Sequence, residues 1–342
     1  MTVYIHSFHY SSASNGIKIT YELISRLNNM GICAKSLCFD PYYFGANIPL
    51  KYLKNTIFCT EKEFPEIEPD DIVIYPEHVK GNPLNANRVV RYLLNKPYYI
   101  FGYGIDYRPT DYILSFSQLV SETLPYLYIM IDERKIYKEI REKNPKRKGI
   151  YSVYFGKCNL DIIRHSNGIL AELQKKYGCV NVITRQFPER NIALGMIAES
   201  DLLVSFDPLS NLNYEATLLG TPVLLLDDSF NTSSTHLPAE QCGYFYNIKD
   251  FEKGKKAVGE SYTNYFNYIA KQDELIKETY TAWVRHFEAC QNPDYLKTNT
   301  EHNRRQKEID YEQFLKKKKA VFSMVATYYD IPQKTAKILG VR

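Results

Sequence analysis

Asp207 and Glu215 are two acidic residues at a point where an apolar stretch gives way to a polar one. They lie in Leu202–Leu226 (LLVSFDPLSNLNYEATLLGTPVLLL), whose pattern predicts a buried strand over 202–206 and then a helix over 212–219. Seven residues separate the acids, so Asp207 is expected at the strand's carboxyl end and Glu215 in the helix's opening turns. A carboxylate only accepts hydrogen bonds and has two oxygens, which suits it to the two hydroxyls of a ribose.

The loop between the two acids leads into the predicted helix at Ser210 and Asn211. N–H groups at the start of a helix lack helical partners and favour a negative ligand. Both residues are therefore candidate contacts for a phosphate. Simpler structural roles remain open for the acids, with Asp207 as a helix N-cap and Glu215 as a solvated helix carboxylate.

The order of residues in this segment resembles the donor-binding region of retaining GT-B glycosyltransferases. The shared features are an acid, seven residues, a second acid, then Ala and later Gly-Thr-Pro-Val. The family motif has Glu at both ends, whereas the first acid here is Asp207. The resemblance implies that Glu215 binds the nucleotide ribose and that Asp207 contacts the donor sugar near the reacting centre.

Other segments agree with this resemblance. The sequence YFGK, ending at Lys157, resembles the strand-end glycine and basic residue near the donor diphosphate, which implies that Lys157 neutralises the leaving nucleoside diphosphate. Arg185 or Arg190, after the next predicted strand, is expected to reach phosphate. The loop SSASNG, ending at Gly16, resembles the loop that approaches the acceptor and pyrophosphate, so Gly16 is a candidate contact.

In the first half, Tyr75–Asn85 (YPEHVKGNPLN) resembles a segment of bacterial surface-polysaccharide glycosyltransferases. The family resemblance favours a retaining, front-face transfer. If the reaction instead inverts, a base must deprotonate the acceptor, and Glu77, His78 and Asp106 are the candidates.

Strands and helices alternate in both halves of the chain, and they would position these residues. In the first half, strands are predicted over 3–8, 34–39, 56–59, 71–75 and 98–101, with helices over 17–31 and 84–94. In the second half, strands over 150–155, 180–184, 202–206 and 223–226 alternate with helices over 167–177, 191–199 and 212–219. This alternation predicts parallel sheets with helices on both faces.

The segment Lys143–Gly149 is charged, contains Pro and Gly, and is predicted to be a linker between domains. The expected fold is α/β, with two Rossmann-like doubly wound domains that face a cleft, as in GT-B enzymes. Residues 1–147 would form the acceptor-side domain and residues 148–300 the nucleotide-sugar-binding domain. The final helices, about 301–342, are expected to cross back onto the first domain, as the resemblance implies.

Composition narrows the classes of protein and site. The 342 residues carry a net charge of +4, which is too weak to indicate a nucleic-acid partner. Seven cysteines without a Cys-x-x-Cys pair argue against a disulfide framework or a zinc site. The paired acids Asp70-Asp71 and Asp227-Asp228 are adjacent rather than spaced as ligands, so neither a metal nor another cofactor is expected.

The N-terminal residues resemble neither a signal peptide nor a membrane span, and we expect a cytoplasmic protein. The basic run Lys316–Lys319, with Arg304-Arg305 upstream, indicates either a solvated helix face or peripheral contact with an anionic membrane.

The family resemblance leads to the hypothesis of a hexosyl-type glycosyltransferase. It would move a sugar from a nucleotide-activated donor to a glycan or lipid-linked acceptor in lipopolysaccharide or capsule synthesis. The alternatives are a nucleotide-sugar epimerase of the same architecture and a non-catalytic glycan-binding or assembly subunit. An NAD-dependent enzyme is less favoured because the chain lacks Gly-x-Gly-x-x-Gly after a strand.

Overall fold

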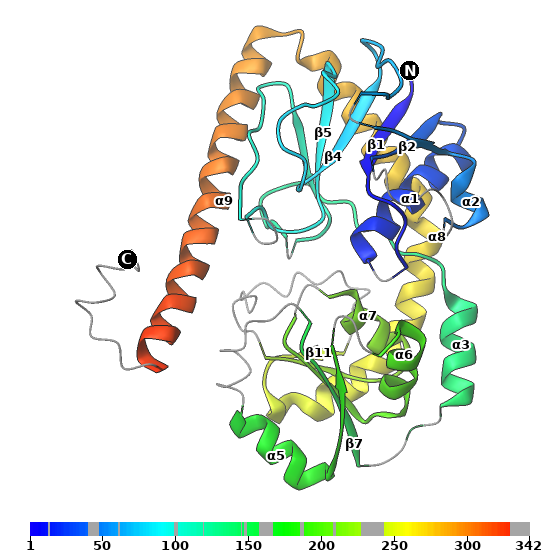
Figure 1. The fold of residues 1–342 in the computed structure, drawn as a ribbon, viewed down its shortest axis with the longest axis vertical. Coiled ribbons are helices and arrows are strands. Elements are labelled where there is room, and N and C mark those ends of the chain that lie inside the picture. Colours follow the sequence, from blue (N-terminus) through cyan, green and yellow to red (C-terminus); the bar gives the residue numbers. More distant parts are fainter. Residues whose placement is uncertain are drawn as a thin grey trace. The chain divides into compact units, whose positions relative to one another are not determined.

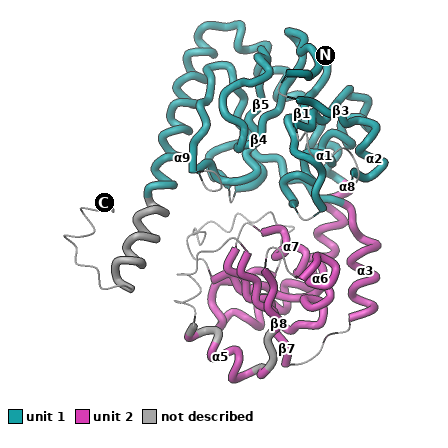
Figure 2. The backbone as a smooth tube through the Cα atoms, viewed as in Figure 1, with its two compact units in different colours: residues 1–131, 271–342 teal, residues 132–270 magenta. Residues whose placement is uncertain are grey.

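The computed structural model describes residues 1–12, 14–39, 48–60, 62–98, 102–118, 120–144, 146, 149–156, 167–184, 188–207, 210–226 and 243–328. The chain forms two compact units (Figure 2). Unit 1 comprises residues 1–131 and 271–342, and unit 2 comprises residues 132–270. Each unit contains one sheet, and every strand pairing within the two sheets is parallel. The expected α/β class with two parallel sheets is therefore confirmed.

The sheet of unit 1 has the strand order β3-β2-β1-β4-β5-β6 (Figure 1). Strand order reverses between β1 and β4, and in open α/β sheets ligands bind beyond the carboxyl ends of the strands at such a switch point. The strands are β1 (Val3–Ser7), β2 (Ala34–Cys38), β3 (Thr56–Phe58), β4 (Ile72–Pro76), β5 (Arg88–Leu93) and β6 (Tyr112–Ser115).

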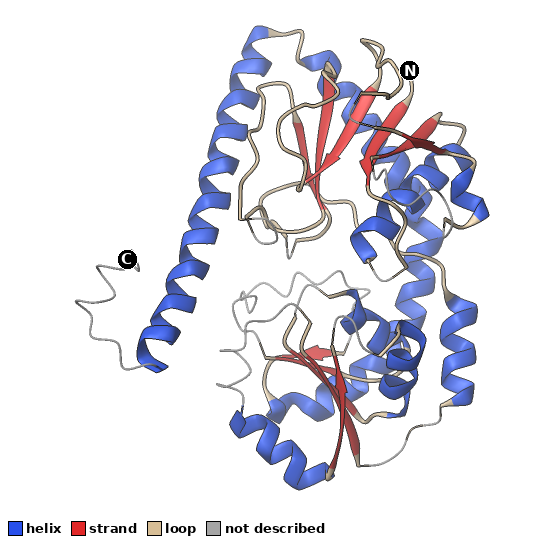
Figure 3. Ribbon diagram, in the orientation of Figure 1, coloured by secondary structure: helices blue, strands red, loops and turns tan. Residues whose placement is uncertain are grey.

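The two faces of this sheet are covered differently. On one face, Ile5 and its neighbours pack against Leu23 of α1 (Asn15–Asn29) and Trp283 of α8 (Phe251–Ala289). On the other, the described residues that cover Tyr75 and its neighbours come from connecting segments, with Leu84 among them (Figure 3). Unit 1 therefore departs from the expected arrangement of helices on both faces. A short helix, α2 (Leu50–Leu53), packs through Tyr52 against α1.

The predicted helix over 84–94 is wrong, because this segment contains a tight turn and then strand β5. The Asn82 side chain bonds both the N–H and the C=O of Ala86, and Asn85 has a φ of 50°. The strand that follows buries its side chains on both faces, so its apolar run lacks the alternation that identifies a half-exposed strand. Of the predicted strand 98–101, Tyr98 lies in a turn with a φ of 68°, and residues 99–101 lie outside the described residues.

Helix α9 (Pro293–Tyr328) packs within unit 1 against the segment before and after β6. The Tyr107 hydroxyl donates to Asp310 at 2.6 Å, and the Asn303 amide donates to the carbonyls of Arg108 and Asp111 at 2.8 and 3.0 Å. The described residues of α9 thus contact the segments of unit 1 that flank β6.

The sheet of unit 2 has the strand order β11-β10-β9-β7-β8, and its switch point lies between β7 and β9. The strands are β7 (Ile150–Tyr154), β8 (Cys179–Ile183), β9 (Leu202–Ser205), β10 (Val223–Leu225) and β11 (Tyr244–Phe245). The helices before α8 are α3 (Arg134–Lys143), α5 (Asn167–Tyr177), α6 (Arg190–Glu199), α7 (Asn211–Leu218) and the one-turn η2 (Ile248–Asp250).

Helices cover both faces of the second sheet. Val153 and its neighbours pack against Leu173 of α5 and Phe251 at the start of α8. On the opposite face, the Ser152 hydroxyl bonds the Ser200 hydroxyl at the end of α6, and α7 contacts β9 and β10. Unit 2 is therefore doubly wound, and the strands and helices predicted between 150 and 226 are confirmed within one or two residues.

The boundaries between the units fall at 131/132 and 270/271, whereas the sequence placed them at 147 and 300. The first difference arises because α3, which precedes the predicted linker, packs on α6 within unit 2. Segment 143–149 accordingly follows one element of unit 2 and precedes another. The second boundary lies inside the continuous helix α8. Within the described part of the chain, no helix combines the length and apolar character that a membrane span requires.

Candidate functional site

The carboxyl ends of β7 and β9 bring Gly156 against Asp207 in unit 2. Gly156 has a φ of +51°, and a Cβ added there would lie 2.4 Å from Cβ of Asp207 and 2.7 Å from its Oδ2. Only glycine fits this position, because the backbone conformation is left-handed and there is no room for a side chain. The predicted acid therefore stands at the switch point, 4% exposed and packed against a glycine backbone.

Ser210, rather than Asp207, is the N-cap of α7. The Ser210 hydroxyl accepts from the N–H of Leu212 at 3.3 Å. The Asp207 carbonyl accepts from the Ser210 N–H at 3.1 Å and from the Asn213 amide at 2.8 Å. Because the cap is supplied elsewhere, the cap role considered for the Asp207 side chain does not apply. Asn211, also a predicted contact, is the first residue of the helix.

Glu215 lies in the middle of α7 and is 3% exposed, so it is not a solvated helix carboxylate. Its Oε1 accepts from Nε of Arg190 at 3.2 Å and also from Nη2 of the same guanidinium. The Tyr137 hydroxyl lies 3.3 Å from the same oxygen. Among the described residues, every hydrogen bond to this carboxylate reaches Oε1, which leaves Oε2 as the oxygen available to a ligand.

Arg190 also bonds Glu133, so it links two carboxylates. Its Nη2 donates to Oε2 of Glu133 at 2.5 Å, and the Tyr137 hydroxyl lies 3.1 Å from the same oxygen. Burial lowers the pKa of the Arg190 guanidinium, but the charges of Glu215 and Glu133 outweigh this effect and raise it, so the group stays cationic. Burial, followed by the charges of these acids, raises the pKa of Tyr137 well above 10, so its hydroxyl remains a donor. We name Glu133, Tyr137, Arg190 and Glu215 the α7 cluster.

Sequence reasoning missed Glu133 and Tyr137. Both belong to the start of α3, on the N-terminal side of the predicted linker, and were assigned to the other domain. The surrounding sequence, DERKIYKEIREK, is charged throughout, so nothing in its pattern marks these two side chains. Of the other predicted donor contacts, Lys157 and Arg185 lie outside the described residues.

Two predicted residues of unit 1, Glu77 and Gly16, lie near the carboxyl ends of its central strands. Glu77 follows β4, is 8% exposed, and accepts from the N–H of Leu94 at 2.9 Å. Gly16 is the second residue of α1, and a Cβ there would lie 3.6 Å from the Leu94 side chain. The structure therefore brings Gly16 and Glu77 to the same residue, Leu94, beside the switch point of this sheet.

His78 lies in an aromatic environment at this end of unit 1. Its ring stacks on Phe8 with centroids 4.3 Å apart, and the His6 ring lies edge-on at 6.0 Å. Burial, followed by the neighbouring His6, lowers the pKa of His78 to about 4, and burial lowers that of His6 to about 4. Both imidazoles are therefore neutral near pH 7.

Asp106 is separate from these residues. Its side chain is 84% exposed and forms an ion pair with Lys307 of α9. A hydrogen bond from Lys307, together with its charge, lowers the pKa of this carboxyl. Its contacts in the structure join a loop to a helix of the same unit.

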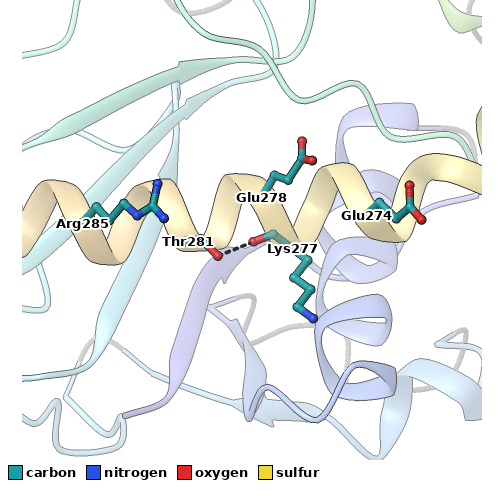
Figure 4. Close-up of a pocket in the computed structure, with 5 residues that line it drawn as sticks. All are labelled: Glu274, Lys277, Glu278, Thr281 and Arg285. Carbon is teal, nitrogen blue, oxygen red and sulfur yellow. Dashed lines mark hydrogen bonds between the residues drawn. The ribbon is translucent and has the colours of Figure 1, made fainter.

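Neither a metal-ligand cluster nor a pocket among the described residues adds to the candidate site. Within the described ranges, no group of three or more His, Cys, Asp or Glu side chains is arranged to hold a metal ion. One pocket lies on α8, remote in sequence from every predicted site residue, and all its lining side chains come from that helix (Figure 4): Glu274, Lys277, Glu278, Thr281 and Arg285.

Comparison with known proteins gives a likeness of fold. No family model and no curated protein matches the chain. The N-terminal domain of Candida albicans trehalose-6-phosphate phosphatase aligns with a TM-score of 0.51 and 10% identity, covering 83% of this chain and 96% of that one. At this identity the likeness is one of fold alone.

Two other solved structures align over most of both chains. An alpha-glucosyltransferase in complex with UDP and a 13-mer DNA gives a TM-score of 0.46 at 11% identity, over 87% of this chain and 99% of that one. Anabaena Alr3699/HepE in complex with UDP gives 0.45 at 10% identity, over 82% and 99%. Both scores lie below 0.5.

Proposed function

We propose that the chain is a glycosyltransferase whose unit 2 binds a nucleotide-activated sugar. The observation that carries this proposal is the placement of two acids around one switch point. Asp207 follows β9 at the carboxyl edge, and Glu215 lies on the helix that comes next, with one carboxylate oxygen that no described residue bonds. The position agrees with the general location of ligands in such sheets, and the residues agree with the donor-binding motif that the sequence resembles.

Each residue has a proposed role. Glu215 accepts from the ribose hydroxyls through Oε2, and Asp207 accepts from hydroxyls of the donor sugar. Lys157 and Arg185 neutralise the diphosphate, and the start of α7 at Ser210 and Asn211 lies on the same side of the sheet as Asp207. No metal or other cofactor is needed for these roles.

The proposed reaction forms a bond between an acceptor hydroxyl oxygen and C1 of the sugar. The bond from C1 to the diphosphate oxygen breaks, and its electron pair leaves with the nucleoside diphosphate. In the retaining, front-face form that we favour, the acceptor proton passes to that departing oxygen. In an inverting form, Glu77 or His78 would take the proton. Burial lowers the pKa of His78 to about 4, which leaves its imidazole neutral near pH 7 but weakly basic. The ion pair with Lys307 makes Asp106 the weakest of the three base candidates.

The acceptor and cellular setting are proposed from the sequence resemblance. A hexosyl group would be transferred to a growing surface glycan or lipid-linked acceptor, as in bacterial lipopolysaccharide or capsule synthesis. The enzyme would act in the cytoplasm, with the basic run at 316–319 against an anionic membrane surface and with no nucleic-acid partner.

The first experiment is a thermal-shift panel of three ribonucleoside diphosphates (UDP, GDP and ADP), the deoxyribonucleotide dTDP, and CMP. At a concentration about 100 times its Kd, a ligand stabilises the folded state by about 2.7 kcal/mol. Glu215→Gln removes a charge while Arg190 keeps Glu133 as its partner, so the fold should persist and the shift should shrink. Glu172→Gln, on the exposed surface of α5 in the same unit, is the matched control and should leave the shift intact.

Two outcomes would contradict the proposal. A full shift in Glu215→Gln would remove this residue from the nucleotide site. Conversion of a nucleotide sugar with free nucleoside diphosphate released and no dependence on an acceptor would favour the epimerase alternative.

A further inference from the structure

Arg190 was expected to bind phosphate, but its contacts point to another role. We infer that Arg190 is a positioning residue that orients Glu215 toward the ribose, and that Glu133 and Tyr137 of α3 hold it in place. The inference rests on the proposed function, because it describes how the same nucleotide site is organised.

The bonds that the Arg190 guanidinium makes leave it no pair of neighbouring nitrogens with which to bind a phosphate. Its bonds to described residues use Nε and Nη2, with Glu215 on both nitrogens and Glu133 on Nη2. A guanidinium grips phosphate with two neighbouring nitrogens, either Nε with Nη2 or Nη1 with Nη2. Both pairs include Nη2, whose two hydrogens are already taken.

The same contacts fix the orientation of the Glu215 carboxylate. Two nitrogens of Arg190 and the Tyr137 hydroxyl converge on Oε1, so the carboxylate is held from one side. Its side chain is only 5% exposed. A buried carboxylate fixed through one oxygen presents the other in a defined direction, and such pre-organisation lowers the entropy lost when a ligand binds.

The charge of the α7 cluster also favours hydroxyls over phosphate. It contains two carboxylates and one guanidinium, so it does not offer a net positive charge to a diphosphate. A ribose, by contrast, brings hydroxyl donors that a carboxylate oxygen accepts. Charge and geometry thus assign the cluster to the sugar of the nucleotide rather than to its phosphates.

The test compares each ribonucleoside diphosphate that binds with its 2′-deoxy counterpart by isothermal titration. The proteins are wild type, Arg190→Gln, Arg190→Lys and Glu133→Gln. Arg134→Gln serves as the control because Arg134 lies on the same helix, is half-exposed and pairs with Asp132 outside the cluster. Thermal unfolding without ligand establishes that each variant is folded.

We expect wild type to prefer the ribonucleotide, and Arg190→Gln to lose about tenfold of that preference, as for one hydrogen bond to a charged group. The affinity for the 2′-deoxynucleotide should barely change. Arg190→Lys keeps the charge but cannot bridge both acids, so its preference for the ribonucleotide should lie between those of wild type and Arg190→Gln. Glu133→Gln should lose a few-fold of the same preference. Arg134→Gln should match wild type.

The outcomes separate this inference from the proposed function. If Arg190→Gln weakens both nucleotides by the same factor, Arg190 binds phosphate and the inference is overturned while the proposed function stands. Unchanged affinities in Arg190→Gln would also overturn it. If wild type binds no nucleotide, or shows no ribose preference, the proposed function fails and the inference fails with it.

Discussion

Each unit contains an arginine–carboxylate cluster, and the two differ in what they leave unsatisfied. In unit 1, Arg91 and Asp111 form an ion pair whose side chains are both 0% exposed. Arg108 bonds Oδ1 of Asp111, while Arg91 and the N–H of Arg108 bond Oδ2. In unit 2, all bonds that described residues make with Glu215 use one oxygen, at the carboxyl edge of the sheet.

The difference shows that residue type alone does not distinguish a structural charge cluster from a binding site. Arg91 also donates to the carbonyls of Val79 and Gly81, so its cluster ties β5 to the loop that covers one face of the sheet. Both oxygens of the Asp111 carboxylate are bonded, so this carboxylate offers a ligand no uncommitted oxygen. Under the proposed function, what distinguishes the α7 cluster from the cluster of unit 1 is a carboxylate oxygen that no described residue bonds, rather than charge itself.

The largest effect is expected at the buried cluster of unit 1. Asp111→Asn leaves Arg91 charged and without its carboxylate, and should lower the free energy of unfolding by about 3–5 kcal/mol. The chain's single tryptophan, Trp283, is fully buried in unit 1, so its fluorescence during urea unfolding reports on this unit. Nucleotide affinity of the folded variant should be unchanged, and a selective loss of affinity would break the comparison.

The next effect is expected where Gly156 meets Asp207. Gly156→Ala combines a left-handed backbone with a contact too short for any side chain, and should cost about 3 kcal/mol and displace the acid. Gly178→Ala, in the same unit at a φ of +70° with open space, is the matched control and should cost about 1 kcal/mol. Urea unfolding followed by circular dichroism measures both, and equal losses would show that the close contact has no cost.

A smaller effect per pH unit is expected from two neutral histidines near the carboxyl end of the sheet of unit 1. The pKa values of His6 and His78 are lowered by burial to about 4, so the unfolded chain binds more protons than the folded one between pH 6.5 and about 4. Stability should therefore fall as the pH drops through this window, by about 1.4 kcal/mol per pH unit for each histidine.

Other groups in unit 1 add to or offset this slope. Burial raises the pKa of Asp310 to about 6, so this group makes the folded state more stable as the pH falls from about 6 to 3.8. Burial lowers the pKa of His286, so this group, like His6 and His78, makes the folded state less stable as the pH falls. His78→Phe should flatten the pH dependence of the Trp283 transition relative to wild type. An unchanged slope would show that His78 titrates normally.

The smallest effect is expected at Asp106. Its pair with Lys307 is exposed on both sides, so Asp106→Asn should change the free energy of unfolding by less than about 0.5 kcal/mol. Ribonucleotide affinity should be that of wild type. If transfer to an acceptor nevertheless disappeared with the fold and affinity intact, Asp106 would be an acceptor base and the reaction would invert.

Unit 2 was more predictable from sequence than unit 1, and for a physical reason. Its strands and helices alternate along the chain, so strand β9, helix α7 and the acid at the carboxyl end of the strand followed from local pattern. In unit 1, β4, β5 and β6 are joined by irregular segments stabilised by side-chain contacts such as those of Asn82, which periodicity does not reveal.

The candidate site was predictable only in part. The positions of Asp207 and Glu215 followed from the spacing of one segment. The bonds from Glu133 and Tyr137 depend on α3 packing against α6, across 57 residues of sequence in the case of Glu133 and Arg190, and no local signal encodes such a contact.

The most direct measurement is a crystal structure of the protein with a bound ribonucleoside diphosphate. The account predicts that the ribose hydroxyls lie about 2.6–3.2 Å from Oε2 of Glu215, with Arg190 still bonded to Oε1. A nucleotide bound elsewhere in the chain, or one whose ribose does not contact Glu215, would contradict it.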